Sequence, residues 1–456
     1  MPVKLSDRHR RLVKVEWRVY VLGAILCAAL TICSRHFGDR GGPYFMAWLT
    51  LAGIAYLLAI REVFATPRFP RRVLLIGLIL AVVWNIAFLR LSPGPDDDIH
   101  RYVWDGRLQR LGYNPYLVVP SDPAAKGLHT AETRNLNNPD LPSPYPPGAQ
   151  FFSRAVTAIQ ESTFAFKAAF AFCEFAIVFV LLDVLRYTRQ AEHLVLAFAW
   201  NPLLAIEVAG SGHIDIVGTL LLVVSAAALL RRWRATAAVA LGLAIAVKLL
   251  PVVLVPFYWK RVRIRDAGLA AGVVGLLYVP FLNRSFFNQG RIPIGSLGTY
   301  VNSFRFNGPV FAALARVASP QLLAGLAVLA GLATATWLRR AGPGWSSDPS
   351  SWEQFAWDPF AWPMAVSLLF APVVFPWYLV WLLPFLTSAS TLLIILWTVS
   401  IIPCYVMWHL RTLGRPWGAL PGGVMLLEYG CLAIAAAIIA WRRITQTSYE
   451  SGKPSR

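Results

Sequence analysis

Residues 73–91 of the chain read VLLIGLILAVVWNIAFLRL, an apolar run interrupted by one asparagine and one arginine. A helix needs about 20 predominantly apolar residues to cross the hydrocarbon core of a bilayer. Similar runs recur along the chain from Val19 to Trp441. The apolar excess is therefore spread over many segments, and residues 73–91 predict one membrane span among several.

The overall composition agrees with this interpretation. The chain has 456 residues, of which 57% are hydrophobic and 14% charged, whereas a soluble domain carries about 25% charged residues. So much apolar surface must face something other than water, and we predict an all-α integral membrane protein. The five cysteines lie within apolar segments and lack CxxC spacing, so we expect neither a disulfide framework nor a thiolate metal site.

The formal net charge of +19 comes from basic residues that gather in short clusters between the apolar runs. The clusters are Arg8-Arg10-Arg11, Arg68-Arg71-Arg72, Arg231-Arg232-Arg234, Lys260-Arg261-Arg263-Arg265, Arg339-Arg340 and Arg442-Arg443. This pattern is typical of cytoplasmic loops, with anionic membrane lipids as partners. Nucleic acid is not an expected partner, because no cluster is interleaved with aromatic residues in a polar domain.

Apolar length and basic loops together predict about twelve transmembrane helices with both termini in the cytoplasm. The spans are expected near residues 18–34, 44–60, 73–91, 164–186, 192–209, 214–230, 266–282, 320–338, 359–374, 377–389, 391–410 and 422–441. Val19–Cys33 is interpreted as the first span and not as a signal peptide, because no small-residue cleavage site follows it.

Residues 235–258 fit this topology less simply. Basic clusters flank the segment on both sides, so a single crossing would place Lys260–Arg265 outside. Lys248 and Pro251 interrupt its middle, and such residues are tolerated at membrane depth when they are buried in protein or face a wet cavity. We expect a re-entrant hairpin, with a single span as the alternative.

The chain is thereby divided into four parts. Residues 1–91 form the N-terminal spans, and residues 92–163 form an extracytoplasmic, catalytic loop of about 70 residues, far longer than ordinary connections. Residues 164–389 form the membrane core, which includes a second outer loop at 283–318, and residues 390–456 form the C-terminal spans and a cytoplasmic tail. Glu174, Asp183 and Glu428, within or at the ends of spans, are interpreted as structural.

The sequence PDDDIHRYVWDGR at residues 95–107 begins where the third span leaves the membrane. Adjacent aspartates repel one another and lose hydration in a cavity, which raises the pKa of at least one and suits general-base catalysis. If residues 98–110 are helical, Asp98, Tyr102 and Asp105 share one face, with Arg101 near both carboxylates. A solvated acidic cap at a helix N-terminus explains the same residues equally well.

The pattern Asp98-x-x-Arg101-Tyr102-x-Trp104-Asp105-Gly106-Arg107 resembles the first outer loop of bacterial GT-C superfamily glycosyltransferases, in particular the polyprenol-phosphate-mannose-dependent mannosyltransferases. Further matches in order include Asn114-Pro115-Tyr116, Asn138-Pro139, Tyr145-Pro146-Pro147, Trp200-Asn201-Pro202, Glu207 to Asp215, Lys248-x-x-Pro251, Phe304-x-Phe306-Asn307-Gly308 and Pro376-Trp377-Tyr378. Two positions depart from the pattern: His100 replaces an aromatic residue, and Phe375 replaces a histidine, which leaves open a different donor sugar or acceptor.

The resemblance implies an inverting hexosyltransferase of the outer face of the bacterial inner (plasma) membrane. It implies transfer of a mannosyl group from a polyprenyl-phosphate donor to a lipid or cell-envelope glycan acceptor. Such a reaction needs a base beside the acceptor hydroxyl and cations beside the departing phosphate. Asp98 is the expected catalytic base, followed by Asp97 and Asp105. No cofactor is predicted; a divalent metal on the carboxylates is left open, since no third ligand is evident.

The other expected site residues bind the substrate. Lys248, Arg101, Arg291 and Arg305 are candidates for the phosphate, with contact to lipid headgroups as the alternative for Lys248 and Arg305. Glu207, His213 and Asp215 flank the turn Gly210-Ser211-Gly212 and are expected to contact sugar or phosphate, unless they form only a polar interfacial turn. The remaining candidates are Tyr102, Trp104, Arg107, Tyr145, Asn307, Trp377 and Tyr378.

Two other classes of protein are compatible with many spans. A transporter or lipid flippase is expected to show internal repeats and polar residues at corresponding span midpoints. The sequence shows no such symmetry, and its polar residues gather at the outer face. A non-enzymatic membrane scaffold would not need the carboxylates of residues 95–107.

Overall fold

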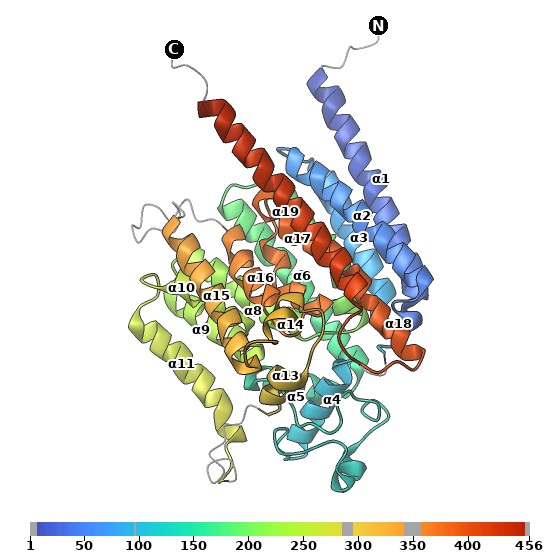
Figure 1. The fold of residues 1–456 in the computed structure, drawn as a ribbon, viewed down its shortest axis with the longest axis vertical. Helices are drawn as coiled ribbons and strands as arrows, with labels where there is room; N and C mark the ends of the chain where they lie inside the picture. Colours follow the sequence, from blue (N-terminus) through green and yellow to red (C-terminus); the bar gives the residue numbers. More distant parts are fainter. Residues whose placement is uncertain (1–6, 95–96, 285–294, 342–356, 452–456) are drawn as a thin grey trace.

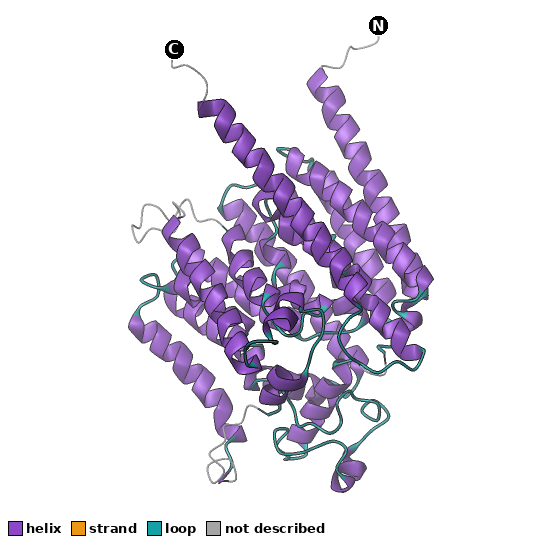
Figure 2. Cartoon of the chain, in the orientation of Figure 1, coloured by secondary structure: helices purple, strands orange, loops and turns teal. Residues whose placement is uncertain are grey.

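The computed structural model describes residues 7–94, 97–284, 295–341 and 357–451. These parts of the chain are helical, as predicted, and the only extended pairing among them is a single parallel bridge between Phe306 and Val373 (Figure 2). Arg291, a predicted phosphate ligand, lies outside the described residues.

Eight helical segments in the described residues are long and apolar enough to cross a membrane. They are α1 (Asp7–Arg35), α2 (Pro43–Ala65), α3 (Arg71–Leu89), α6 (Thr163–Tyr187), α11 (Ile264–Tyr278) with η6 (Val279–Phe281), α15 (Pro320–Ala341), the run η12 (Ala389–Thr391), α17 (Leu392–Ser400), η13 (Ile402–Tyr405) and α18 (Val406–Thr412), and α19 (Gly422–Ser451). The protein is therefore a multi-pass membrane protein.

The predicted count of twelve spans is not confirmed. One further span is formed if the pair Glu192–Ala199 and Leu204–Gly210, bent by 67°, is counted as a single crossing. Three other apolar segments are shorter than a full crossing: α8 (Asp215–Leu230), α9 (Arg234–Val247) and Pro376–Phe385. Apolar composition alone did not reveal these breaks; Pro376 and Pro384, for example, limit the last segment to short 3₁₀ turns.

Shorter elements connect the spans. They are η1 (Phe37–Asp39), α4 (Ile99–Arg110), η2 (Pro123–Leu128), α5 (Pro147–Ile159), η3 (Glu192–Val195), α7 (Leu196–Ala199), the π-helical η4 (Leu204–Gly210), η5 (Leu250–Leu254), α10 (Val255–Tyr258), α13 (Leu297–Ser303), α14 (Pro309–Leu314), η9 (Asp358–Phe360), α16 (Ala361–Leu369), η10 (Pro376–Trp381) and η11 (Leu383–Phe385).

The segment 235–258 folds back on itself. α9 ends at Lys248, whose backbone is extended, and η5 and α10 lead the chain back. Ser225 of α8 donates a hydrogen bond to the Ala237 carbonyl at 2.6 Å and lies 2.7 Å from the Tyr258 hydroxyl. The start and the end of the segment therefore lie at the same level, while a re-entrant position in a membrane stays a prediction.

The helices of the long loop lie at the opposite end of the molecule from the beginning of α1 and the end of α19 (Figure 1). α4 and α5, from residues 92–163, lie at the lower end in this view, and α1 begins and α19 ends at the upper end. α4 packs closely against α5: a Cβ at Gly106 would come within 2.4 Å of the Ser153 carbonyl oxygen. This close approach, which glycine permits, holds the two loop helices against each other.

Candidate active site

Asp98 lies directly before the first turn of α4. Its side chain is 16% exposed, and its Oδ2 atom lies 3.7 Å from His213 Nδ1. Asn137 Nδ2 donates a hydrogen bond to its other oxygen at 2.5 Å. Burial raises the pKa of Asp98, but His213, Lys248 and Asn137 outweigh burial and bring this pKa below its ordinary value. Asp98 is therefore an ionised, partly accessible carboxylate at neutral pH, the state in which a base can accept a proton. The raised pKa that the run of aspartates suggested is not found at Asp98.

His213 lies between two carboxylates. Its Nε2 atom is 3.1 Å from Glu207 Oε2, and the Tyr405 hydroxyl donates to Glu207 Oε1. Burial lowers the pKa of His213, but Asp98 and Glu207 outweigh burial and raise it to about 9. The imidazole is therefore a cation at neutral pH, and Glu207 and His213 come together as their flanking of one turn suggested.

A stack of four rings leads from His213 toward the second outer loop. The His213 ring lies on Trp377 with centroids 3.9 Å apart and planes inclined by 9°. Trp377 lies on Phe375 at 4.3 Å and 9°, and Phe375 lies on Phe306 at 4.5 Å and 29°. The ring of Trp377 is thus covered by protein rings on both faces, and its expected role in binding the substrate stays a prediction.

Lys248 is held at the break between α9 and η5 by the start of α8. Its Nζ atom lies 2.8 and 2.9 Å from the two carboxylate oxygens of Asp215, and Trp381 Nε1 donates to the same carboxylate at 2.7 Å. Nζ also lies 4.3 Å from the ring centroid of Tyr378. Asp215 is 1% exposed and Lys248 is 23% exposed. The Lys248 side chain is therefore partly accessible, and its charge reaches Asp98.

Asp97, the second choice for the base, has a different environment. Arg40, in the turn between α1 and α2, donates to its two oxygens at 2.9 and 2.8 Å. The same guanidinium donates to Ser211 Oγ at 2.5 Å. The side chains of Arg40 and Asp97 are 7% and 4% exposed. A buried pair of this kind loses much stability when one partner is neutralised, so Asp97 joins the loop to the bundle.

Asp105, the third choice, points into the loop. Its Oδ2 accepts hydrogen bonds from Ser143 Oγ and, at 2.9 Å, from Gln150 Nε2. Burial raises its pKa to about 6, although Arg101, Ser143 and Gln150 act in the opposite direction. These partners fasten α4 to the loop and to α5.

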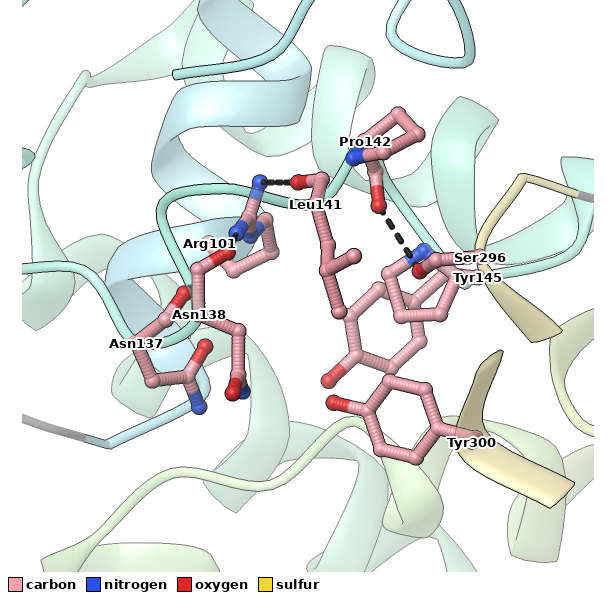
Figure 3. A pocket seen from close by; sticks show the side chains of 9 residues that line it. Arg101, Asn137, Asn138, Leu141, Pro142, Tyr145, Ser296 and Tyr300 are labelled. Carbon is pink, nitrogen blue, oxygen red and sulfur yellow. Dashed lines mark hydrogen bonds between the residues drawn. The ribbon is translucent and has the colours of Figure 1, made fainter. Parts of the chain in front are cut away.

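A small pocket adjoins Asp98 (Figure 3). Its lining comprises Arg101, Asn137, Asn138, Leu141, Pro142, Pro144, Tyr145, Ser296 and Tyr300. Figure 3 shows the Tyr145 and Tyr300 hydroxyls on the same side, facing the pocket. Arg101 donates to the carbonyl oxygens of Asn137, Asn138 and Leu141 at 2.8, 2.7 and 3.1 Å. Arg101 therefore holds residues 137–141, which form one wall of the pocket.

Tyr102 also lies at this site. The backbone N–H of Ile214 donates to its hydroxyl at 3.4 Å, and its ring meets Tyr145 edge to face at 5.0 Å. Both phenols lie close enough to Asp98 for its charge to raise their pKa, after the larger effect of burial.

Other predicted site residues have partners elsewhere. Trp104 is buried within the loop and stacks on His129 at 4.3 Å, and Arg107 pairs with Glu161 at 2.6 Å. Arg305 donates to three backbone oxygens at the end of α13, and Asn307 donates to Glu428 at 2.9 Å. The structure does not bring these four residues into the contacts around Asp98, and their predicted roles stay predictions.

Sequence reasoning missed four residues of the site. Asn137 and Tyr300 line the pocket, Arg40 holds Asp97, and Tyr405 holds Glu207. Asn137 precedes the quoted Asn138-Pro139, and Tyr300 lies in the predicted outer loop, so both had a weak signal. Arg40 and Tyr405 lie in a short turn and inside a predicted span, where no motif marks them.

A metal centre is not evident in the described parts of the chain. No group of three or more histidine, cysteine, aspartate or glutamate side chains in those parts could hold an ion. The charges around Asp98 are instead balanced by Lys248, Arg40 and His213.

Comparison with protein families bears on the class of protein. A family model described as alpha-(1->6)-mannopyranosyltransferase, N-terminal domain, matches residues 27–262 of the 456. This match confirms the class expected from the motifs, a GT-C type membrane glycosyltransferase. The chain belongs to the MptA_B family of mannosyltransferases. The matched region contains Asp98, Glu207, His213 and Lys248. No curated protein matches the chain.

Proposed function

We propose that the protein transfers a mannosyl group from a polyprenyl-phosphate donor to a hydroxyl of a lipid or cell-envelope glycan, with inversion, at the outer face of the membrane. One observation carries the proposal: an ionised, partly exposed carboxylate, Asp98, lies within electrostatic reach of a partly exposed ammonium, Lys248. The Asp98 carboxylate can accept the proton of the attacking hydroxyl, and the Lys248 ammonium can stabilise the charge of the departing phosphate.

The reaction needs four bond changes in one step. The acceptor oxygen bonds to the anomeric carbon from the face opposite the phosphate, and its proton passes to Asp98. The bond from the anomeric carbon to the phosphate oxygen breaks, and its electron pair remains on the lipid phosphate. Lys248 stabilises the added negative charge, and release of the proton from Asp98 to water restores the base.

The outer face is proposed from charge. The loop helices α4 and α5 and the beginning of α1 lie at opposite ends of the molecule. The predicted cytoplasmic pair Arg339-Arg340 lies in the last turn of the span α15, which ends away from the loop helices (Figure 1). By the positive-inside rule, this arrangement supports an extracytoplasmic position for Asp98.

The test is transfer of labelled mannose from polyprenyl-phosphate mannose by purified protein, with products identified by mass spectrometry. Asp98→Asn is expected to lower the rate by about 10²- to 10⁴-fold, the usual contribution of a general base. Asp122→Asn is the matched control, because Asp122 is an exposed loop carboxylate that accepts only a local backbone bond. Equal rates in the wild type and Asp98→Asn would remove Asp98 from the reaction, and lipid movement without a glycosylated product would favour a transporter.

A further inference from the structure

We propose that His213 is a positioning residue for Asp98: as an imidazolium held between Asp98 and Glu207, it orients the Asp98 carboxylate and keeps it ionised. The proposal rests on the proposed function, since it concerns the base of that reaction. It replaces the role in binding sugar or phosphate that the sequence suggested for His213.

The geometry leaves His213 little room to bind a substrate. Its side chain is 2% exposed, and Trp377 covers one face of the ring. The backbone N–H of His213 donates to the Glu207 carbonyl at 2.9 Å. Gly212, at φ +78°, makes this tight turn, where a Cβ would lie 2.5 Å from Ile99. Ile99 directly follows Asp98, so the turn that fixes the histidine is packed against the chain that carries the base.

Charge explains why a cation is needed here. Asp98 and Glu207 face the ring from two elements, and a neutral imidazole would leave two neighbouring carboxylates without a cation between them. The flat stack on Trp377 also favours a cation over the indole face. The pKa of His213, raised to about 9 by these carboxylates against the effect of burial, agrees with this assignment.

Other charged and titratable groups around His213 have their own partners. These groups are Arg40, Lys167, Tyr102, Tyr405, Asp215 and Lys248. Arg40 is paired with Asp97 and Lys248 with Asp215, and Lys167 donates to the carbonyl oxygens of Phe88 and Leu91. Among the described residues, these other cations are thus held by other partners. His213 is the cation that lies between Asp98 and Glu207.

A pH profile separates positioning from binding. In His213→Gln, the acidic midpoint of kcat is expected to move up by about one to two pH units, because an opposite charge close to a carboxylate lowers its pKa by that amount. The KM for polyprenyl-phosphate mannose should not change, and activity should recover above the new midpoint. A raised KM with an unmoved midpoint, or a uniform loss of kcat at every pH, would overturn the proposal.

Two variants serve as controls. His193→Gln removes another buried histidine, whose ring nitrogens bond backbone groups of Phe69 and Val63 and whose ring packs on Phe69. No carboxylate is among these contacts, so this variant is expected to leave the midpoint unchanged. Glu207→Gln removes the opposite end of the row but leaves His213 protonated at acidic pH, so its midpoint is expected to stay or to fall. A rise of about one pH unit or more in Glu207→Gln relative to the wild type would contradict the proposal, and this comparison does not require His213→Gln to fold.

A second readout does not depend on the donor. Infrared difference spectra of the wild type against Asp98→Asn report whether the Asp98 carboxyl is protonated. At the same mildly acidic pH, the His213→Gln background is expected to show a protonated Asp98 and the wild type an ionised one. If both backgrounds show an ionised Asp98, His213 does not set the charge of Asp98, whatever the protein transfers. If Asp98 is protonated only in the His213→Gln background but mannose transfer fails, the proposed donor is wrong and the positioning role stands.

Discussion

Three aspartates of one loop have the same side-chain chemistry and three different environments. Asp97 is paired with buried Arg40, Asp105 accepts hydrogen bonds from Ser143 and Gln150, and Asp98 is partly exposed beside the pocket. Spacing along the sequence could not separate them, because the separation comes from residues far along the chain. The environment leaves Asp98 as the one carboxylate of the three that a substrate hydroxyl could approach.

Asp105→Asn tests this distinction through stability and activity. The folded protein raises the pKa of Asp105 to about 6, so the folded chain holds a proton that the unfolded chain releases between about pH 4 and pH 6. The associated stabilisation is present below pH 4 and is lost as pH rises through 6. Asparagine keeps the neutral form at every pH, so the variant should gain on the order of 3 kcal/mol relative to the wild type at pH 7.5 and little at pH 4.

The measurement is the apparent melting temperature in detergent at both pH values, together with mannose transfer. The rate of transfer by Asp105→Asn should stay within about tenfold of the wild-type rate. This loss is smaller than the loss of about 10²- to 10⁴-fold expected on removing a general base. A loss as large as that of Asp98→Asn would place Asp105 in the reaction.

At the scale of elements, the site is built where helices break. Lys248 ends α9, Asp215 begins α8, and His213 lies in the gap after the π-helical η4. Helix ends leave backbone groups and polar side chains free for a ligand, whereas a continuous apolar span does not. The four-ring stack connects His213 to Phe306, which lies between the short helices α13 and α14.

The last helix, α19, shows how one polar group can hold an exposed element. Only 6% of its most apolar window is buried within the protein, yet Glu428 is fully buried. Its carboxylate accepts hydrogen bonds from Trp397 Nε1 at 2.8 Å and from Asn307 Nδ2 at 2.9 Å. Glu428, interpreted as structural from the sequence, thus joins α19 to α17 and to the second outer loop.

Glu428→Ala is therefore expected to lower the stability of the folded protein by on the order of 3 kcal/mol, because two buried donors lose their acceptor. The apparent melting temperature in detergent measures this loss. Glu428→Gln, which keeps one acceptor, should lose less. Leu427→Ala is the control, since Leu427 is 57% exposed and should change stability little; an equal loss in both positions would mean that α19 is held by apolar packing.

At the scale of the whole molecule, the sequence was most informative about class. Apolar runs and basic clusters predicted a multi-pass helical protein, and Lys248 stood out because a lysine in an apolar run is costly. The span count was not confirmed, because apolar length does not show where a segment such as 377–389 is broken into short turns, as it is at Pro376 and Pro384. The interruption at Lys248, by contrast, was expected from the sequence. The contacts of Asp98 with His213 and of Arg40 with Asp97 depend on packing between distant segments, which one sequence does not reveal.

The orientation in the membrane is a prediction for the molecule as a whole. In a Cys431→Ser background, which removes the exposed cysteine, Lys126→Cys and Gln190→Cys place thiols at exposed positions in the loop 92–163 and after α6. A membrane-impermeant maleimide should label Lys126→Cys in intact spheroplasts and Gln190→Cys only after permeabilisation. The reverse pattern would place the proposed reaction in the cytoplasm.

The face-to-face ring stack limits how position 375 can vary between related proteins. Phe375 lies flat between Phe306 and Trp377, and each aromatic pair contributes about 0.5–1.5 kcal/mol beyond its burial. Histidine and tyrosine are planar enough to replace it, whereas leucine or valine would lose both contacts. We therefore expect the need for a flat ring to limit which residues can occupy this position in related proteins. A change from one ring to another there does not by itself indicate a different substrate.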